Sequence, residues 1–177
     1  MRVNIYLAMV SKLHIGGTIT TPGWEVLNIN PGPHVDHVCD ASDLSLFNDN
    51  VFSIIYASHI LEHLDFVNQI TAALREWNRV LQPGGKVYIS VPDLDVLSKL
   101  FLDKNLTADE RFQIMQMMFG SHIDDHDYHL VGLNEEFLRG YLEYTGFINI
   151  EKVGVFGLFE DTSTMLFNGV LISLNIV

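Results

Sequence analysis

The clearest pattern in the chain is a pair of short apolar runs separated by an amphipathic stretch. Residues 51–56 and 86–91 are rich in β-branched and aromatic side chains, as expected of parallel strands that are buried on both faces. Between them, apolar residues recur at spacings of three and four, which predicts a helix that ends before the Pro-Gly-Gly turn at 83–85. Its apolar positions are Phe66, Ile70, Ala73, Trp77, Val80 and Leu81. The segment therefore predicts one crossover from strand to helix to strand.

Three further strands are predicted ahead of this unit. Residues 12–15 form an apolar run into a double glycine, residues 24–29 follow a turn signal, and residues 35–39 end at an aspartate. Only residues 18–23 separate the double glycine from the second strand, although a parallel return normally needs a dozen residues or more. The first crossover helix is therefore expected to be missing or shortened. One face of the sheet then needs a cover, which we expect from residues 1–11 or from a second chain.

The pattern becomes helical after the strand at 86–91. Asp93 and Thr107 stand where the caps of two amphipathic helices are expected, and Asn134 stands at the start of a third. Residues 121–131 form a polar segment dense in histidine and aspartate. We expect residues 93–133 to be a helical, histidine-rich insertion over the carboxyl edge of the sheet, where ligands of open α/β sheets bind.

Two closing strands are predicted at residues 147–153 and 164–176, with a hairpin turn at Asn168-Gly169 as an alternative within the second. The alternation of strands and helices predicts an α/β protein with a mostly parallel sheet. No repeat, low-complexity tract or linker divides the sequence. Residues 1–177 are therefore expected to form a single domain.

Composition narrows the functional classes. The net charge of −12, from ten Lys and Arg against 22 Asp and Glu, argues against a nucleic-acid partner because phosphate binding needs clustered cations. No apolar run is long enough to span a bilayer, and the N-terminal VNIYLAMV lacks a signal-peptide cleavage site, so no membrane partner is expected. A single cysteine, Cys39, excludes an internal disulfide and fits a reducing, cytoplasmic compartment.

Five segments follow one another in an order that is typical of one family. They read LHIGG at 13–17, GWEVLNI at 23–29, VDHVCDASDLSLF at 35–47, IIYASHILEHL at 54–64 and LREWNRVLQPGGKVYISVPDLD at 74–95. Together they resemble the class I S-adenosylmethionine-dependent methyltransferases, in particular the small methyltransferase-11-like group. The resemblance implies a Rossmann-like, doubly wound sheet whose last strand is antiparallel. It also implies methyl transfer from S-adenosyl-L-methionine.

The resemblance implies a cofactor site as well. Its parts correspond to a donor loop at His14, Ile15, Gly16 and Gly17, a ribose-binding position at Asn28, an adenine side at Asp40, Ala41, Ser42 and Leu44, and a strand landing at Ser58 and His59. Asn28 departs from the family, because an amide has one acceptor oxygen where a carboxylate accepts hydrogen bonds from both ribose hydroxyls. A degenerate domain without catalysis, acting as a binding or dimerisation module, is therefore an alternative.

Two groups of histidines suggest further chemistry. Residues 59–63 spell H-x-x-E-H, a zinc-hydrolase pattern that needs all five residues on one helix and a third ligand. His59 directly follows a predicted strand, so we expect no metal, and a zinc hydrolase is the less favoured alternative. The second group could hold a divalent metal or supply a base, or it is a solvated loop. It consists of His122, Asp124, Asp125, His126, Asp127 and His129.

The functional prediction is S-adenosylmethionine-dependent methyl transfer to a small-molecule or saccharide-like acceptor. The sulfonium donor is already activated, so the protein mainly has to align the nucleophile with the methyl group. A base is needed where the nucleophile arrives protonated, and His59 and His129 are the candidates. A homodimer is a further expectation, since a second chain could cover the open face of the sheet.

Overall fold

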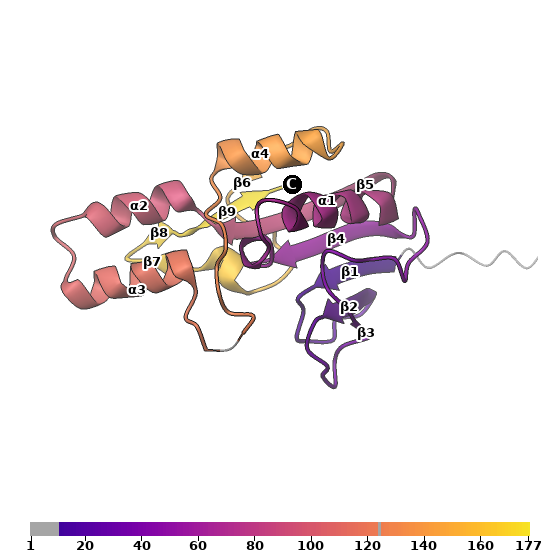
Figure 1. The fold of residues 1–177 in the computed structure, drawn as a ribbon, viewed down its shortest axis with the longest axis horizontal. Coiled ribbons are helices and arrows are strands. Elements are labelled where there is room, and N and C mark those ends of the chain that lie inside the picture. The colour runs from indigo at the N-terminus through magenta and orange to yellow at the C-terminus, as the bar shows by residue number, and fades with distance from the viewer. Residues whose placement is uncertain (1–10, 124) are drawn as a thin grey trace, which may run out of the picture.

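The computed structural model describes residues 11–123 and 125–177, whose strands form a seven-stranded sheet in the order β3-β2-β1-β4-β5-β9-β6 (Figure 1). The first five strands pair in parallel, whereas β9 runs antiparallel to both β5 and β6. The strands are β1 (Ser11–Ile15), β2 (Trp24–Asn28), β3 (His37–Val38), β4 (Phe52–Ser58), β5 (Leu81–Pro92), β6 (Lys152–Val153) and β9 (Ser173–Ile176). This mostly parallel sheet with an antiparallel last strand confirms the predicted fold class.

Of the four α-helices in the described residues, three begin at the predicted caps. The four are α1 (Gln69–Val80), α2 (Leu94–Leu102), α3 (Ala108–Phe119) and α4 (Glu135–Tyr144), with the short 3₁₀ helices η1 (Leu61–His63) and η2 (Thr162–Thr164). Asp93 caps α2, Thr107 forms a capping box with Glu110 in α3, and Asn134 caps α4 through its side-chain oxygen. No helix within the described ranges is long and apolar enough to cross a membrane.

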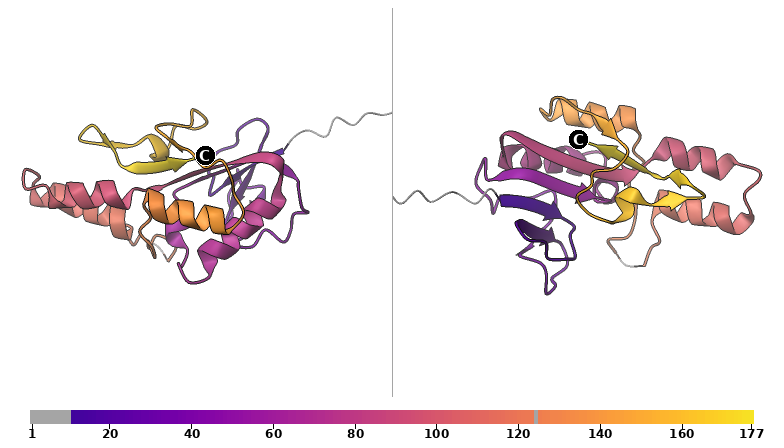
Figure 2. Two further views of the ribbon diagram at one scale, coloured as in Figure 1. Left: turned by 90° about the horizontal axis from the view of Figure 1, so that it is seen from above. Right: turned by 180° about the vertical axis from the view of Figure 1, so that it is seen from behind.

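One face of the sheet is covered by α1 and α4, which lie on the same side in Figure 2. The amphipathic spacing of α1 places Ile70, Ala73, Leu74, Trp77 and Val80 against the sheet, all of them fully buried. They join alternate strand residues such as Ile55 and Ile89 in the main hydrophobic core. This face is the conventional, helix-covered side of an α/β sheet.

The opposite face has no helix between β1 and β2, as predicted. Its cover comes from residues 154–165, the segment that follows β6 and crosses this side of the sheet in Figure 2. The Phe159 ring packs against His14, Tyr56 and Trp24, with centroid distances of 4.4, 4.6 and 5.0 Å. The expected cover was residues 1–11 or a second chain, and residues 1–10 lie outside the described residues. The cover by residues 154–165 was not foreseen from the sequence.

The helices α2 and α3 form an arm that extends beyond the sheet together with the hairpin of β7 (Leu166–Phe167) and β8 (Val170–Leu171) (Figure 1). The arm has its own small core, made of Leu97 from α2, Ile114 from α3, and Phe167 and Ile172 from the hairpin region. The hairpin turns at Asn168-Gly169, both with positive φ. The hairpin alternative, rather than a continuous strand over 164–176, is therefore the one that the structure shows.

Two predicted strands are shorter than expected, for local reasons. Strand β3 begins only at His37, because the Asp36 carboxylate accepts a hydrogen bond from the Val26 amide where a strand would place a backbone carbonyl. In the segment 147–153 only Lys152 and Val153 pair with β9. Asn149 has a φ of +56° there, which interrupts extended backbone.

Candidate functional site

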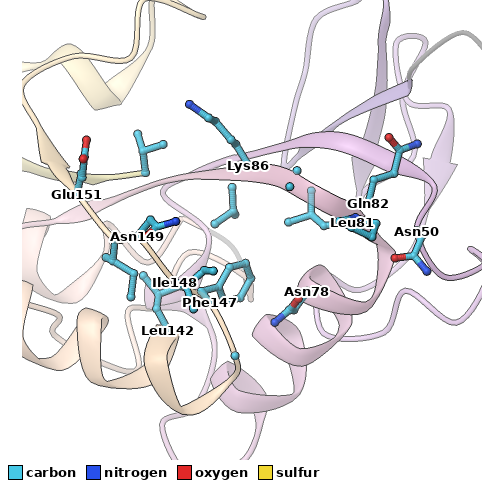
Figure 3. Close-up of a pocket in the computed structure, with 17 residues that line it drawn as sticks. Asn50, Asn78, Leu81, Gln82, Lys86, Leu142, Phe147, Ile148, Asn149 and Glu151 are labelled. Atoms are coloured by element: carbon cyan, nitrogen blue, oxygen red, sulfur yellow. The ribbon is translucent and has the colours of Figure 1, made fainter.

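Two cavities lie at opposite edges of the sheet. The larger, of about 610 Å³, is at the amino edge of the parallel strands, where amide side chains and the segment 146–151 surround it (Figure 3). Lys86 and Glu151 are the ionisable residues of its lining. The second, of about 560 Å³, is at the carboxyl edge. Because open α/β sheets bind ligands outside the carboxyl ends of their strands, we take the second cavity, called the carboxyl-edge cleft below, as the candidate site.

The carboxyl-edge cleft is built from successive strand ends and from the loop before α4. Its lining comes from β1, β2, the loop after β3, the landing after β4 with η1, the start of α1, and the histidine-rich loop. The lining residues are Ile15, Gly16, Leu27, Asn28, Ile29, Cys39, Asp40, Ala41, His59, Ile60, His63, Leu64, Gln69, Asp125, His126, Tyr128 and Leu130. Strand ends that are distant in sequence therefore converge on one cavity.

Gly16 forms the turn after β1 and cannot readily be replaced. Its φ is +78°, and its amide donates a hydrogen bond to the Leu27 carbonyl over 2.7 Å. A Cβ atom at this position would lie 2.1 Å from Cδ1 of Ile60. Glycine therefore allows the β1 loop to pack directly against the landing after β4.

Asn28 ties the short loop after β1 to the end of β2. Its Nδ2 donates to the Gly17 carbonyl over 3.1 Å, and its Oδ1 accepts from the Asn30 amide over 2.9 Å. A carboxylate at this position could not donate to the Gly17 carbonyl and would place two acceptors against each other. Asn28 therefore suits the short loop after β1, because that loop offers a carbonyl to which the side-chain amide can donate.

Asp40 and Ala41 are held in place at the end of β3. Asp40 Oδ1 accepts hydrogen bonds from both the amide and the hydroxyl of Ser42, each over 2.7 Å. The Ala41 carbonyl accepts from the indole Nε1 of Trp77 over 2.8 Å. Through this bond the floor of the cleft is anchored to α1.

His59 occupies a tight landing after β4, with a φ of +55°. Its amide donates to the Ser90 carbonyl over 2.8 Å, which keeps the landing against β5. Its ring lies between two side chains, with Nε2 at 3.0 Å from Ser173 Oγ and Nδ1 at 3.1 Å from Glu62 Oε1. The left-handed backbone at a non-glycine residue is sparsely populated and is frequent at functional sites.

The H-x-x-E-H run does not form a single helix. His59 directly follows strand β4, whereas Glu62 and His63 lie in the 3₁₀ helix η1, which spans Leu61–His63. The second histidine-rich segment brings His129 next to this helix, with the His129 and His63 rings 4.9 Å apart. Burial lowers the pKa of His129, and the neighbouring Glu62 opposes this effect. Asp124, part of the same predicted group, lies outside the described residues.

Several predicted site residues lie away from the carboxyl-edge cleft. His14 is packed among aromatic rings on the opposite face, where burial lowers its pKa to about 4 against the opposing charge of Asp161. Gly17 accepts the Asn28 bond, Ser42 supports Asp40, and Leu44 is fully buried in the main core. His129 lines a neighbouring hollow of about 310 Å³ that also reaches His59. Ser58 lines neither cavity, and its Oγ is buried.

The sequence reasoning missed part of the lining. Cys39, Gln69, Tyr128 and Leu130 line the carboxyl-edge cleft although no motif marks them. A signal was present for the last two, because they are isolated large side chains in an otherwise polar loop that was expected to lie over this edge. No comparable signal distinguishes Gln69 from the other polar residues at the start of α1.

Comparison with known proteins supports the expected resemblance. Residues 25–89 match the family Methyltransf_11, described as a methyltransferase domain. No curated protein matches the chain. The match runs from β2 into β5 and includes the ends of β2, β3 and β4 at the carboxyl-edge cleft, but not the end of β1 or the histidine-rich loop.

Solved structures resemble the chain over most of its length. A methyltransferase dependent on S-adenosylmethionine from Archaeoglobus fulgidus matches with a TM-score of 0.55 and 18% identity, over 80% of this chain and 62% of its own. A methyltransferase dependent on S-adenosylmethionine from Methanosarcina mazei matches with a TM-score of 0.55 and 17% identity. The match covers 94% of this chain and 89% of that protein. Human N-acetylserotonin methyltransferase, solved in complex with S-adenosylmethionine, matches with a TM-score of 0.53 and 12% identity. The match covers 97% of this chain and 48% of that protein. The chain thus spans less than two thirds of several of these proteins, and the likeness establishes the fold.

Proposed function

Since this chain has the class I S-adenosylmethionine-dependent methyltransferase fold and that family's sequence pattern over residues 25–89, we propose that it transfers a methyl group from S-adenosyl-L-methionine to a small-molecule or saccharide-like acceptor. The observation that carries the proposal is the carboxyl-edge cleft. It brings Gly16, Asp40 and His59, from three separate strand ends, to one cavity of about 560 Å³.

The donor would lie over the ends of β1, β2 and β3. Gly16 would let the backbone approach the methionine part, Asn28 would face the ribose, and Asp40 with Ala41 would border the adenine; all four residues line the cleft. Asp40 uses Oδ1 for Ser42, which leaves Oδ2 to accept a hydrogen bond from the exocyclic amine of the base. The apolar side chains of Ile29 and Leu64 complete a partly apolar cavity, as small-molecule sites commonly have.

When bound, S-adenosyl-L-methionine supplies an activated methyl group. The chain's own contribution is alignment of the nucleophile and removal of its proton. His59 is the proposed base, because it lines the cleft and its Nδ1 lies 3.1 Å from Glu62 Oε1. The acceptor would replace Ser173 at Nε2 and give up its proton there, and the Glu62 carboxylate beside Nδ1 would stabilise the imidazolium that forms. His129 reaches the neighbouring hollow and is the second candidate.

The test is titration calorimetry with S-adenosyl-L-methionine and S-adenosylhomocysteine. We expect both to bind the wild-type chain and to raise its melting temperature, because a ligand that binds only the folded state stabilises it. Gly16→Ala should weaken binding at least about tenfold, since its Cβ would collide with Ile60. Gly23→Ala is the matched control: Gly23 has a similar φ of +80°, open space around it and no place in the cleft lining.

Absence of binding up to millimolar ligand would contradict the enzyme proposal. It would favour the second candidate function, a binding or dimerisation module. A specific observation supports that candidate: the arm exposes Leu102, Leu166 and Phe112, at 74%, 61% and 57%. Light scattering after gel filtration would then show a dimer that Leu102→Glu and Leu166→Glu dissociate.

The remaining expectations belong to this proposal as well. The acidic net charge of −12 disfavours a nucleic-acid acceptor, and a single cysteine suits a cytoplasmic location. Cell fractionation would test the location. Methylation assays with pooled small metabolites and with nucleic acid would test the class of acceptor. Incorporation of labelled methyl groups into nucleic acid would overturn the first expectation.

A further inference from the structure

Glu62 is an unusual acidic residue because it is buried beside histidines rather than beside a lysine or arginine. Its exposed fraction is 1%, and neither carboxylate oxygen has a hydrogen-bond partner among the described residues. His59 Nδ1 is 3.1 Å from Oε1, but the two atoms are not aligned for a hydrogen bond. A buried carboxylate without a partner is unfavourable, because burial removes its hydration and nothing replaces it. A bound cation would compensate the charge of this carboxylate.

Two histidine nitrogens lie close to this carboxylate. Glu62, His63 and His129 each offer one atom, and the three atoms all lie within 4.8 Å of one another. His129 Nδ1 is buried and has no hydrogen-bond partner in residues 11–123 and 125–177.

The surrounding backbone fixes the orientation of these ligands. His63 Nδ1 lies 3.1 Å from the Tyr128 carbonyl, which can only accept, so this nitrogen donates there and Nε2 is the atom that would bind a metal. Metal-binding histidines commonly donate their second nitrogen to a backbone carbonyl in this way. The Leu130 amide donates to the Glu62 carbonyl over 2.7 Å, which holds the histidine-rich loop against η1.

We propose that Glu62, His63 and His129 form a binding site for a divalent transition metal, with Zn²⁺ as the best fit. Two imidazoles and one carboxylate are a ligand set that zinc takes, with a fourth position left for an oxygen ligand such as water. Ligands about 2.1 Å from a tetrahedral ion are about 3.4 Å apart, so the side chains would close by no more than about 1.4 Å.

The site is distinct from the H-x-x-E-H arrangement of zinc hydrolases. His59 is outside the cluster of three, and its place as the proposed base is not needed for metal binding. The metal ligand that replaces it is His129, from a loop more than sixty residues further along the chain. Metal binding at this site does not depend on the proposed methyl transfer, and a metal here would join η1 to the loop that forms the rim of the carboxyl-edge cleft.

The test is zinc binding by the purified chain in the absence of S-adenosyl-L-methionine. Chelator-treated protein is titrated with Zn²⁺ against a chromogenic indicator, and bound metal is counted after dialysis. We expect one zinc per chain, and at least about tenfold weaker binding in Glu62→Gln and in His129→Gln. His34→Gln is the control, because His34 is exposed and bonds only to Thr20 among the described residues.

Absence of stoichiometric zinc, or equal retention in all three variants, would overturn the proposal. Circular dichroism checks that the variants are folded. If Glu62→Gln or His129→Gln is unfolded, the visible spectrum of the wild-type chain with added Co²⁺ decides the question. Intense bands of a four-coordinate ion support the site, whereas the spectrum of hydrated Co²⁺ contradicts it. The calorimetric titration with S-adenosyl-L-methionine is run in parallel, so loss of donor binding and loss of metal binding are seen separately.

Discussion

The two faces of the sheet are covered by different means. On one face α1 and α4 present apolar side chains, and the core contains fully buried Trp77. On the other face, residues 154–165 place the rings of Phe156 and Phe159 against Tyr56 of β4. Polar side chains of the same segment form hydrogen bonds beside these rings. Among these bonds, the Tyr56 hydroxyl donates to Asp161 Oδ2 over 2.7 Å.

The difference shows that an α/β sheet can do without a crossover helix when a later segment brings large rings to its surface. Apart from the short helix η2, this segment has an irregular backbone, so many of its polar groups need partners from the sheet. Asn175 supplies such partners, since its Nδ2 donates to the carbonyls of Gly154 and Ser163. The helix-covered face relies on apolar volume, whereas the loop-covered face combines rings with buried polar bonds.

The largest effect is expected on the helix-covered face, from Trp77→Ala. This change removes a fully buried ring and its bond to the Ala41 carbonyl. We expect the free energy of unfolding to fall by about 4 kcal/mol, as for other large-to-alanine changes in cores. Urea unfolding followed by circular dichroism measures it. Trp77→Phe keeps part of the apolar volume and should lose less; an equal loss in both variants would show that the hydrogen bond, not the ring volume, dominates.

On the loop-covered face, Phe159→Ala should cost less, about 2–3 kcal/mol. Phe159 contacts three rings but is only half-buried, so part of its surface remains in water in the folded state. The same urea experiment applies. Phe159→Leu restores apolar volume and should recover about half of the loss. No measurable loss in Phe159→Ala would mean that residues 154–165 do not stabilise this face.

Tyr56→Phe tests the polar part of the loop-covered face. It removes the donor to Asp161, whose pKa lies below its usual range: burial opposes ionisation, but hydrogen bonds from Ser163 and Tyr56 outweigh it. Losing a hydrogen bond to a charged group should cost about 2 kcal/mol at pH 7. The control is Tyr88→Phe, since Tyr88 packs on Phe156 and its hydroxyl has no bond among the described residues. Similar losses in the two variants would contradict the proposed role of Asp161.

The helix-covered face and the strand ends were predictable because local patterns determine them. The spacing of apolar residues identified α1, and the caps at Asp93 and Thr107 identified the next two helices, since each signal lies within one helical turn of its effect. Parallel strands bring their carboxyl ends to one edge, so Gly16, Asp40 and His59 could be expected to share a cavity.

Contacts between distant segments could not be predicted. Nothing in the spacing of Phe159 indicates that it packs on His14, and His14 was assigned to the donor loop although strand alternation turns it to the other face. The neighbourhood of Glu62, His63 and His129 likewise depends on how a long polar loop folds back. Asn28, which suggested a degenerate site from sequence alone, has a local role beside the Gly17 carbonyl.

The smallest effect, seen only as a pH dependence, is expected from His14→Phe. Folded His14 has a pKa of about 4, below its ordinary value of 6.5, so the unfolded chain binds a proton that the folded chain does not. Stability that depends on neutral His14 is present above pH 6.5 and is lost as the pH falls toward 4. Between pH 7 and pH 5 the wild-type chain should lose on the order of 1 kcal/mol more than His14→Phe. Asp161, the charged group facing His14, remains in both chains. Parallel pH profiles for the wild type and His14→Phe would show that His14 is not buried as a neutral ring.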